Sequence, residues 1–130
     1  MVVVRICMMK TARLFNPSNP AIQPIQLRIC DDFSSRLMGL MFQRDIEKQS
    51  GILLKMDQPS RLNASIHMLF MNFNIAVIWL DENLVVVDTA LAKAWRLYYA
   101  PQKPALSVVE AHPDRLSDFS IGDRLELQYE

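Results

Sequence analysis

The sequence lacks the features that mark several common classes of protein. Its 130 residues include only three glycines and two cysteines, and 14 Lys and Arg residues are balanced by 14 Asp and Glu residues. Two cysteines do not make the disulfide framework of a small secreted domain, and neither belongs to a CxxC pair. We therefore expect Cys7 and Cys30 to be small, buried, reduced thiols. No segment matches a phosphate loop, a zinc cluster or the nucleophile elbow of a serine hydrolase.

The absence of excess charge and of long apolar runs excludes further classes. A protein that binds nucleic acid of any sequence carries a basic excess to neutralise phosphates, whereas the formal net charge here is zero; only a local basic patch is compatible with that total. No apolar stretch is long enough to span a membrane as a helix. Residues 1–9 are apolar, but Arg5 interrupts them and no small-residue cleavage pattern follows. We therefore expect a cytoplasmic protein with no membrane span and no nucleic-acid partner.

The longest apolar region, residues 64–87, organises the rest of the chain. Within it, residues 75–80 are wholly apolar and are bounded by polar turns, a pattern typical of a strand that is covered on both faces. Residues 81–83 supply the polar gap that a hairpin needs. The pattern therefore predicts a central three-stranded meander made of residues 64–70, 75–80 and 84–87.

The remaining pattern predicts a mainly β protein with one short helix. Residues 25–30 alternate apolar and polar side chains, as in a half-buried strand. After Asp31 the period changes, and Phe33, Leu37 and Leu40 recur at helical spacing, which predicts a helix over about 32–41. Further strands are expected at 11–15, 51–56, 85–91, 105–111 and 124–129. The expected fold is a small antiparallel β-sandwich or partly open barrel, with residues 1–20 as an N-terminal extension or first strand and 21–130 as a single β domain.

An ordered set of short motifs runs through most of the chain. It comprises Arg36, Gly39, Leu40 and Met41, then Gly51, Met68, Asp81, residues 85–87, Val109 with Glu110, and Gly122 with Asp123. This set, spread over roughly residues 25–129, resembles the family called domain of unknown function 192. The resemblance implies a small β-sandwich-like fold, an unassigned biochemical activity and export of many members. The chain departs from the family pattern after Met68, where residues 69–71 replace Lys, Asn and Thr.

Of the two histidines, His67 is a candidate for metal binding. His67, Met68 and Met71 offer imidazole and thioether groups, which suit copper(I). On a strand, however, His67 and Met68 would point to opposite faces. We favour core methionines beside a partly buried histidine, and we expect neither a metal nor a cofactor. His112 has no nucleophile near it in sequence and is best interpreted as a histidine in a surface loop.

The acidic residues offer two possible arrangements. Asp81, Asp88 and Glu110 include a potential acid and base pair of the kind that glycosidases use. Glu110 lies inside an apolar strand, and Arg36 lies on a helix that packs by its apolar face, so each charge must reach solvent or find a partner. We predict that Arg36 and Glu110 form an ion pair between helix and sheet, because Arg suits a bidentate contact with a carboxylate. The alternative is a small-molecule enzyme whose pocket uses Arg36, Glu110 and a histidine.

The aromatic loop at residues 95–101 is the candidate contact surface. Aromatic side chains with polar tips are favoured at binding surfaces, although a loop packed over an open sheet end is the alternative. No residues have catalytic spacing, so we favour a non-catalytic binding or accessory module that contacts an unknown protein, peptide or small ligand. Trp79 should be buried and Trp95 more exposed. The candidate ligand-binding residues are Arg36, His67, Trp95, Tyr98, Tyr99 and Glu110.

Overall fold

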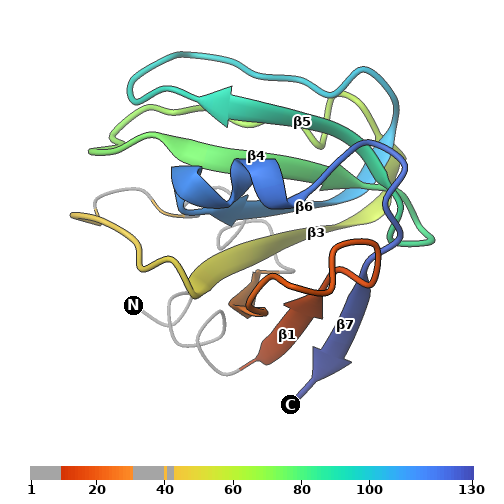
Figure 1. Cartoon of the computed structure of the whole chain (residues 1–130). Helices are drawn as coiled ribbons and strands as arrows, with labels where there is room; N and C mark the ends of the chain where they lie inside the picture. The colour runs from red at the N-terminus through yellow and green to blue at the C-terminus, as the bar shows by residue number, and fades with distance from the viewer. Residues whose placement is uncertain (1–9, 31–39, 41–42) are drawn as a thin grey trace.

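Seven strands form one sheet, with the spatial order β5-β4-β6-β3-β2-β1-β7 (Figure 1). The structure is a computed structural model that describes residues 10–30, 40 and 43–130. The elements are β1 (Thr11–Phe15), β2 (Ile25–Cys30), β3 (Ser50–Ser60), β4 (Ile75–Leu80), β5 (Val86–Ala92), β6 (Ala105–Ala111), the 3-10 helix η1 (Pro113–Asp118) and β7 (Glu126–Tyr129). The mainly β fold predicted from the sequence is confirmed. Within these described ranges, no helix is long and apolar enough to cross a membrane.

The sheet forms a partly open barrel. Its outermost strands, β5 and β7, approach each other at one end, where Val85 and Arg124 form an isolated antiparallel bridge. Beside this bridge, the N–H of Leu125 donates to the carbonyl of Leu84 at 2.8 Å. Five neighbouring strand pairs are antiparallel, as expected, and β2 and β3 form the one parallel pair between described strands. A parallel pair requires a long crossover, and the stretch between residues 30 and 50 provides it.

β4 lies between two apolar clusters, and all six of its residues are buried. Residues 75, 77 and 79 join the first cluster, which the segment 64–71 covers. Residues 76, 78 and 80 belong to the second cluster. This cluster also contains buried side chains from β1 and β2, and Phe119, which follows η1. In Figure 1, η1 crosses β4 and β6 on the side facing the viewer. Because alternate side chains point to opposite faces of a strand, a strand covered on both faces is apolar throughout, as the sequence indicates.

The predicted three-stranded meander is wrong in one of its three strands. β4 and β5 do pair as a hairpin, and Oδ1 of Asp81 accepts hydrogen bonds from the N–H groups of Asn83 and Val85 at 2.8 and 3.0 Å. The other neighbour of β4 is β6, not residues 64–70. Residues 64–70 form turns and a single bridge, and they cover the first cluster. Hydrophobic periodicity does not separate such a covering segment from a buried strand.

The helix expected over 32–41, including Arg36, lies outside the described residues apart from Leu40, which is buried. Cys7 also lies outside them. Cys30 is buried and disulfide-bonded, which corrects the expected reduced thiol. The expectation rested on the small number of cysteines and on the absence of a CxxC pair, whereas a disulfide depends on proximity in space rather than on spacing in sequence.

η1 is fixed to the rest of the molecule by Arg115, a buried residue that the sequence did not single out. Its guanidinium donates to the carboxylate of Asp118 at 2.5 Å, to the carbonyl of Lys48 at 2.6 Å and to the carbonyl of Gln23. A buried charge is costly unless such partners surround it. We therefore assign Arg115 a structural role, which links η1 to the segments that lead into β2 and β3.

Candidate functional site

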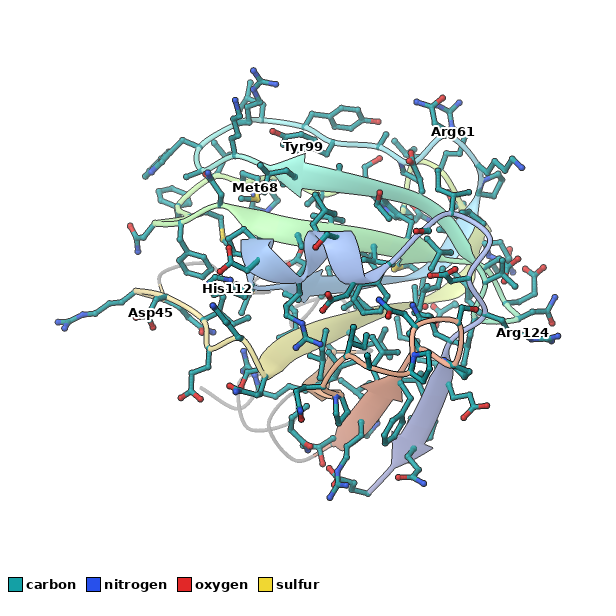
Figure 2. The ribbon with its side chains drawn as sticks, viewed as in Figure 1. Asp45, Arg61, Met68, Tyr99, His112 and Arg124 are labelled. Atoms are coloured by element: carbon teal, nitrogen blue, oxygen red, sulfur yellow. The ribbon has the colours of Figure 1, made fainter. Side chains whose placement is uncertain are left out.

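Two loop segments, residues 61–71 and 93–101, run antiparallel beside the first cluster. Ile66 and Tyr99 exchange two backbone hydrogen bonds of 2.9 Å. Next to them, the N–H of Met68 donates to the carbonyl of Arg96, and the N–H of Trp95 donates to the carbonyl of Met68, both at 2.8 Å. Figure 2 shows Arg61, Met68 and Tyr99 along the same side of the molecule, next to β4 and β5. The two segments therefore form one surface supported by shared backbone bonds.

The inward side of this surface is part of the core. Ile66 and Met68 are buried in the first cluster, and Tyr99 packs against it. The Tyr99 hydroxyl also accepts a hydrogen bond from the N–H of Lys93 at 2.9 Å. Trp79 is buried, and its Nε1–H donates to the carbonyl of Ala64 at 2.7 Å. These contacts give Tyr99 a supporting role, and they confirm that Trp79 is buried.

The outward side carries five large hydrophobic side chains that are between 46% and 75% exposed. We call this set the aromatic strip: Leu62, Phe70, Trp95, Leu97 and Tyr98. The rings of Phe70 and Trp95 meet edge to face with centroids 5.4 Å apart. The hydroxyl groups of Ser65 and Tyr98 lie 3.1 Å apart and are hydrogen-bonded to each other. The predicted exposure of Trp95 is confirmed, and the strip extends beyond the loop that the sequence indicated.

Phe70 and Trp95 both have left-handed backbone conformations, with φ values of 61° and 68°. For bulky side chains this region is sterically unfavourable, at a cost of about 1–3 kcal/mol for each residue. The backbone bond from Trp95 to Met68 helps to hold one of these conformations. Strained residues of this kind concentrate at functional sites, so the pair is a stronger indication of a contact surface than exposure alone.

The charged side chains that the two segments carry have one sign. These segments carry Arg61, Lys93 and Arg96, and Lys103 follows the second segment; all four are exposed, and residues 58–80 and 89–109 contain no Asp or Glu. The nearest acidic residue in sequence, Asp88, accepts hydrogen bonds from the N–H groups of Thr89 and Gln102. A protein with no net charge therefore has a locally basic surface around its most exposed apolar side chains.

Glu110 is a second candidate site, within the core. It is 5% exposed, and its cross-strand neighbours on β3 and β4, Ile52 and Val77, both belong to the first cluster. Burial raises the pKa of its carboxyl group from 4.5 to about 7. Among the residues that the structure describes, its carboxylate has no hydrogen-bonding or ionic partner. Arg36 lies outside those residues, so the ion pair remains a prediction.

The other sequence candidates have local structural roles. Nδ1 of His67 accepts a hydrogen bond from the N–H of Leu69 at 3.2 Å, and Met68 and Met71 are buried in the first cluster. Nδ1 of His112 accepts from the N–H of Asp114 at 3.0 Å and caps η1. The described ranges contain no group of three or more His, Cys, Asp or Glu residues suited to a metal ion. The methionines proposed for copper are thus core side chains, and both Asp81 and Asp88 hold backbone N–H groups.

Sequence analysis found only part of the aromatic strip. It identified Trp95 and Tyr98, but it assigned Phe70 to a strand and passed over Leu62 and Leu97. A usable signal was present in the sequence, because residues 93–97 combine two basic and two large apolar side chains, and residues 89–109 contain no acidic residue. Glu110 was correctly identified as a carboxylate in an apolar setting.

Several known proteins resemble this chain. A UPF0127 protein of Pyrococcus furiosus is 38% identical over 104 residues, which are 78% of this chain and 86% of the relative. A UPF0127 protein of Thermococcus sibiricus is 34% identical over 120 residues, covering 90% and 75% of the two chains.

Two solved structures share the fold. One, a candidate transcription regulator from Sinorhizobium meliloti, has a TM-score of 0.77 and 18% identity over 91% of this chain and 92% of its own. The other, a protein of unknown function from Novosphingobium aromaticivorans, has a TM-score of 0.73 and 19% identity over 89% of this chain and 83% of its own. The model of the family DUF192, Uncharacterized ACR, matches residues 15–127. With relatives more than 30% identical over most of their length, the chain belongs to the DUF192 family.

Proposed function

We propose that this protein is a non-catalytic binding module whose contact surface is the aromatic strip. The observation that carries the proposal is the exposed, edge-to-face pair of Phe70 and Trp95, in which both residues have positive φ values. Large aromatic side chains dominate the energetics of many interfaces, and removing one such anchor commonly costs 2 kcal/mol or more of binding free energy. The first cluster beneath the strip provides a rigid support, which lowers the entropic cost of association.

A thermal-shift screen against peptides, sugars and lipids tests this proposal, because a ligand that prefers the folded state raises the melting temperature. Each ligand that stabilises the native protein is retested on the double variant Phe70→Ala/Trp95→Ala. The matched control is Ile121→Ala, which removes an exposed apolar side chain outside the strip. We expect the strip variant to lose the shift and the control to keep it. Ligands that stabilise both variants equally would contradict the assignment of the contact surface.

The second candidate function is that of a small-molecule enzyme. The observation in its favour is the burial of the Glu110 carboxyl group, which raises its pKa. A buried carboxyl group with a pKa near 7 is able to exchange a proton at neutral pH, as general acids and bases do. The histidines proposed as its partners are engaged in local turns through their Nδ1 atoms. The binding module therefore accounts for more of the described surface.

We favour an oxidising compartment over the cytoplasm that the sequence predicts. The support is the disulfide at Cys30, because disulfides persist in secreted and periplasmic proteins and are rare in reducing compartments. Separating cell fractions and detecting the native protein with an antibody tests this choice. Recovery of the protein in the cytoplasmic fraction alone would favour the original prediction.

A further inference from the structure

We infer that the aromatic strip docks on an anionic lipid surface. The inference rests on the proposed binding function and names its partner. Three properties of the described surface support it: the mixture of aliphatic and aromatic side chains, the basic residues around them, and the fixed backbone that presents both.

The side-chain chemistry of the aromatic strip suits the boundary between lipid headgroups and acyl chains. Trp and Tyr concentrate at that boundary because each has an apolar body and a polar tip. Leu62 and Leu97 are the most exposed of the five side chains, at 75% and 70%, and they carry no polar group. Aliphatic side chains of this kind gain free energy by entering an acyl layer.

The same side chains are less suited to a single-stranded nucleic acid. Bases stack on the open faces of aromatic rings. The rings of Phe70 and Trp95 are inclined by 63° and meet edge to face, so they do not form a parallel stacking platform. Base stacking would also leave the two exposed leucines without a role. Lipid therefore accounts for the whole strip, whereas nucleic acid accounts for part of it.

The charge around the aromatic strip complements an anionic bilayer. Arg61, Lys93, Arg96 and Lys103 flank the apolar side chains, and residues 58–80 and 89–109 include no Asp or Glu. The Asp88 carboxylate reaches only the end of the second segment, where it accepts a hydrogen bond from the N–H of Gln102. Each Lys or Arg near such a surface strengthens binding by roughly fivefold. Arg61 is also held in place, because its Nε–H donates to the carbonyl of Pro101 at 3.0 Å.

Backbone hydrogen bonds join the two segments that carry these side chains. The bonds between Ile66 and Tyr99 and between Met68 and Arg96 join the two segments, while Ile66 and Met68 anchor them in the core. Apolar and basic side chains therefore project from a supported surface rather than from two independent loops. These shared backbone bonds hold the two segments in one fixed arrangement.

Vesicle co-sedimentation of the full chain tests the inference. The probes are vesicles of phosphatidylcholine alone and vesicles that contain about one third phosphatidylglycerol. We expect binding to the anionic vesicles, at least tenfold weaker binding to the neutral ones, and loss of binding near 1 M salt, where the Debye length falls to about 3 Å.

Trp95→Ala/Leu97→Ala should weaken binding to the anionic vesicles at least tenfold, and Lys93→Gln/Arg96→Gln should weaken it by a similar factor. Ile121→Ala and Arg124→Gln, which alter exposed side chains outside the strip, should leave it unchanged.

The outcomes separate the two proposals. Equal binding to both kinds of vesicle, or no binding to either at low salt, overturns the lipid assignment. Binding of oligothymidylate in the same buffer, lost in Trp95→Ala/Leu97→Ala, also overturns it but supports the strip as a contact surface. Vesicle binding that Trp95→Ala/Leu97→Ala does not weaken contradicts both the lipid assignment and the proposed function. Circular dichroism of each variant confirms that a loss of binding does not come from unfolding.

Discussion

Replacing Glu110 with Gln should change how the stability of the protein depends on pH. In the folded state the pKa of the Glu110 carboxyl group is about 7, against an ordinary value of 4.5, and burial is the cause. The difference, at about 1.4 kcal/mol per pKa unit, amounts to about 3 kcal/mol. The folded state holds this proton more tightly than the unfolded chain does. The loss of folding stability that ionisation of Glu110 causes is therefore absent below pH 4.5. It grows as the pH rises and is complete above about pH 7.

Urea denaturation at pH 5 and pH 8 measures this effect. The free energy of unfolding of the native protein should fall between these pH values by about 2–3 kcal/mol more than that of Glu110→Gln. The control is Glu126→Gln, which removes an exposed carboxylate on β7 and should retain the native pH dependence. Parallel curves for the native protein and Glu110→Gln would refute the reasoning. They would mean that a cation stabilises the charged form of Glu110, as the predicted contact with Arg36 would.

Three further predictions follow from particular residues. The ion pair between Arg36 and Glu110 is the alternative to this pH dependence, and a double-mutant cycle of Arg36→Met and Glu110→Gln in urea unfolding tests it. If the pair exists, each single change should cost about 3–5 kcal/mol, and a coupling energy near zero would exclude it. Gly51→Ala should destabilise the protein by about 1–3 kcal/mol, since its Cβ would lie 2.7 Å from the backbone oxygen of Glu110; an unchanged melting temperature would contradict this close contact. Acrylamide should quench Trp95 more strongly than Trp79 in single-tryptophan variants, and equal quenching would contradict the fold.

The sequence predicted the strands best where both faces are buried or where alternation is clean. The limits of β4 and β6 were predicted residue for residue, because polar or proline-containing turns bound both segments. The segment 64–70 was misassigned since it has the composition of a buried strand but packs as a cover over the sheet. Strand order was not predictable from periodicity, which identifies buried faces but does not identify neighbours. For this reason the sequence did not predict that β6, which is far from β4 in sequence, would be its neighbour in place of residues 64–70.

The candidate site was partly predictable for a similar reason. Trp95 and Tyr98 stood out as aromatic residues in a polar, proline-flanked loop, and Glu110 stood out as a charge in an apolar strand. Phe70 could not be assigned to the same surface, because its contact with Trp95 joins segments that are 25 positions apart and depends on an unusual backbone conformation at both residues.

Hydroxyl-radical footprinting in the presence and absence of anionic vesicles tests the central claim most directly. Radicals oxidise exposed aromatic and aliphatic side chains, so the method compares the aromatic strip with Ile121 and Tyr129, which are exposed elsewhere on the molecule. We expect bound vesicles to reduce oxidation of Phe70, Trp95 and the other strip residues, while Ile121 and Tyr129 react as before. Equal protection of all these side chains, or protection of Ile121 and Tyr129 alone, would contradict this claim.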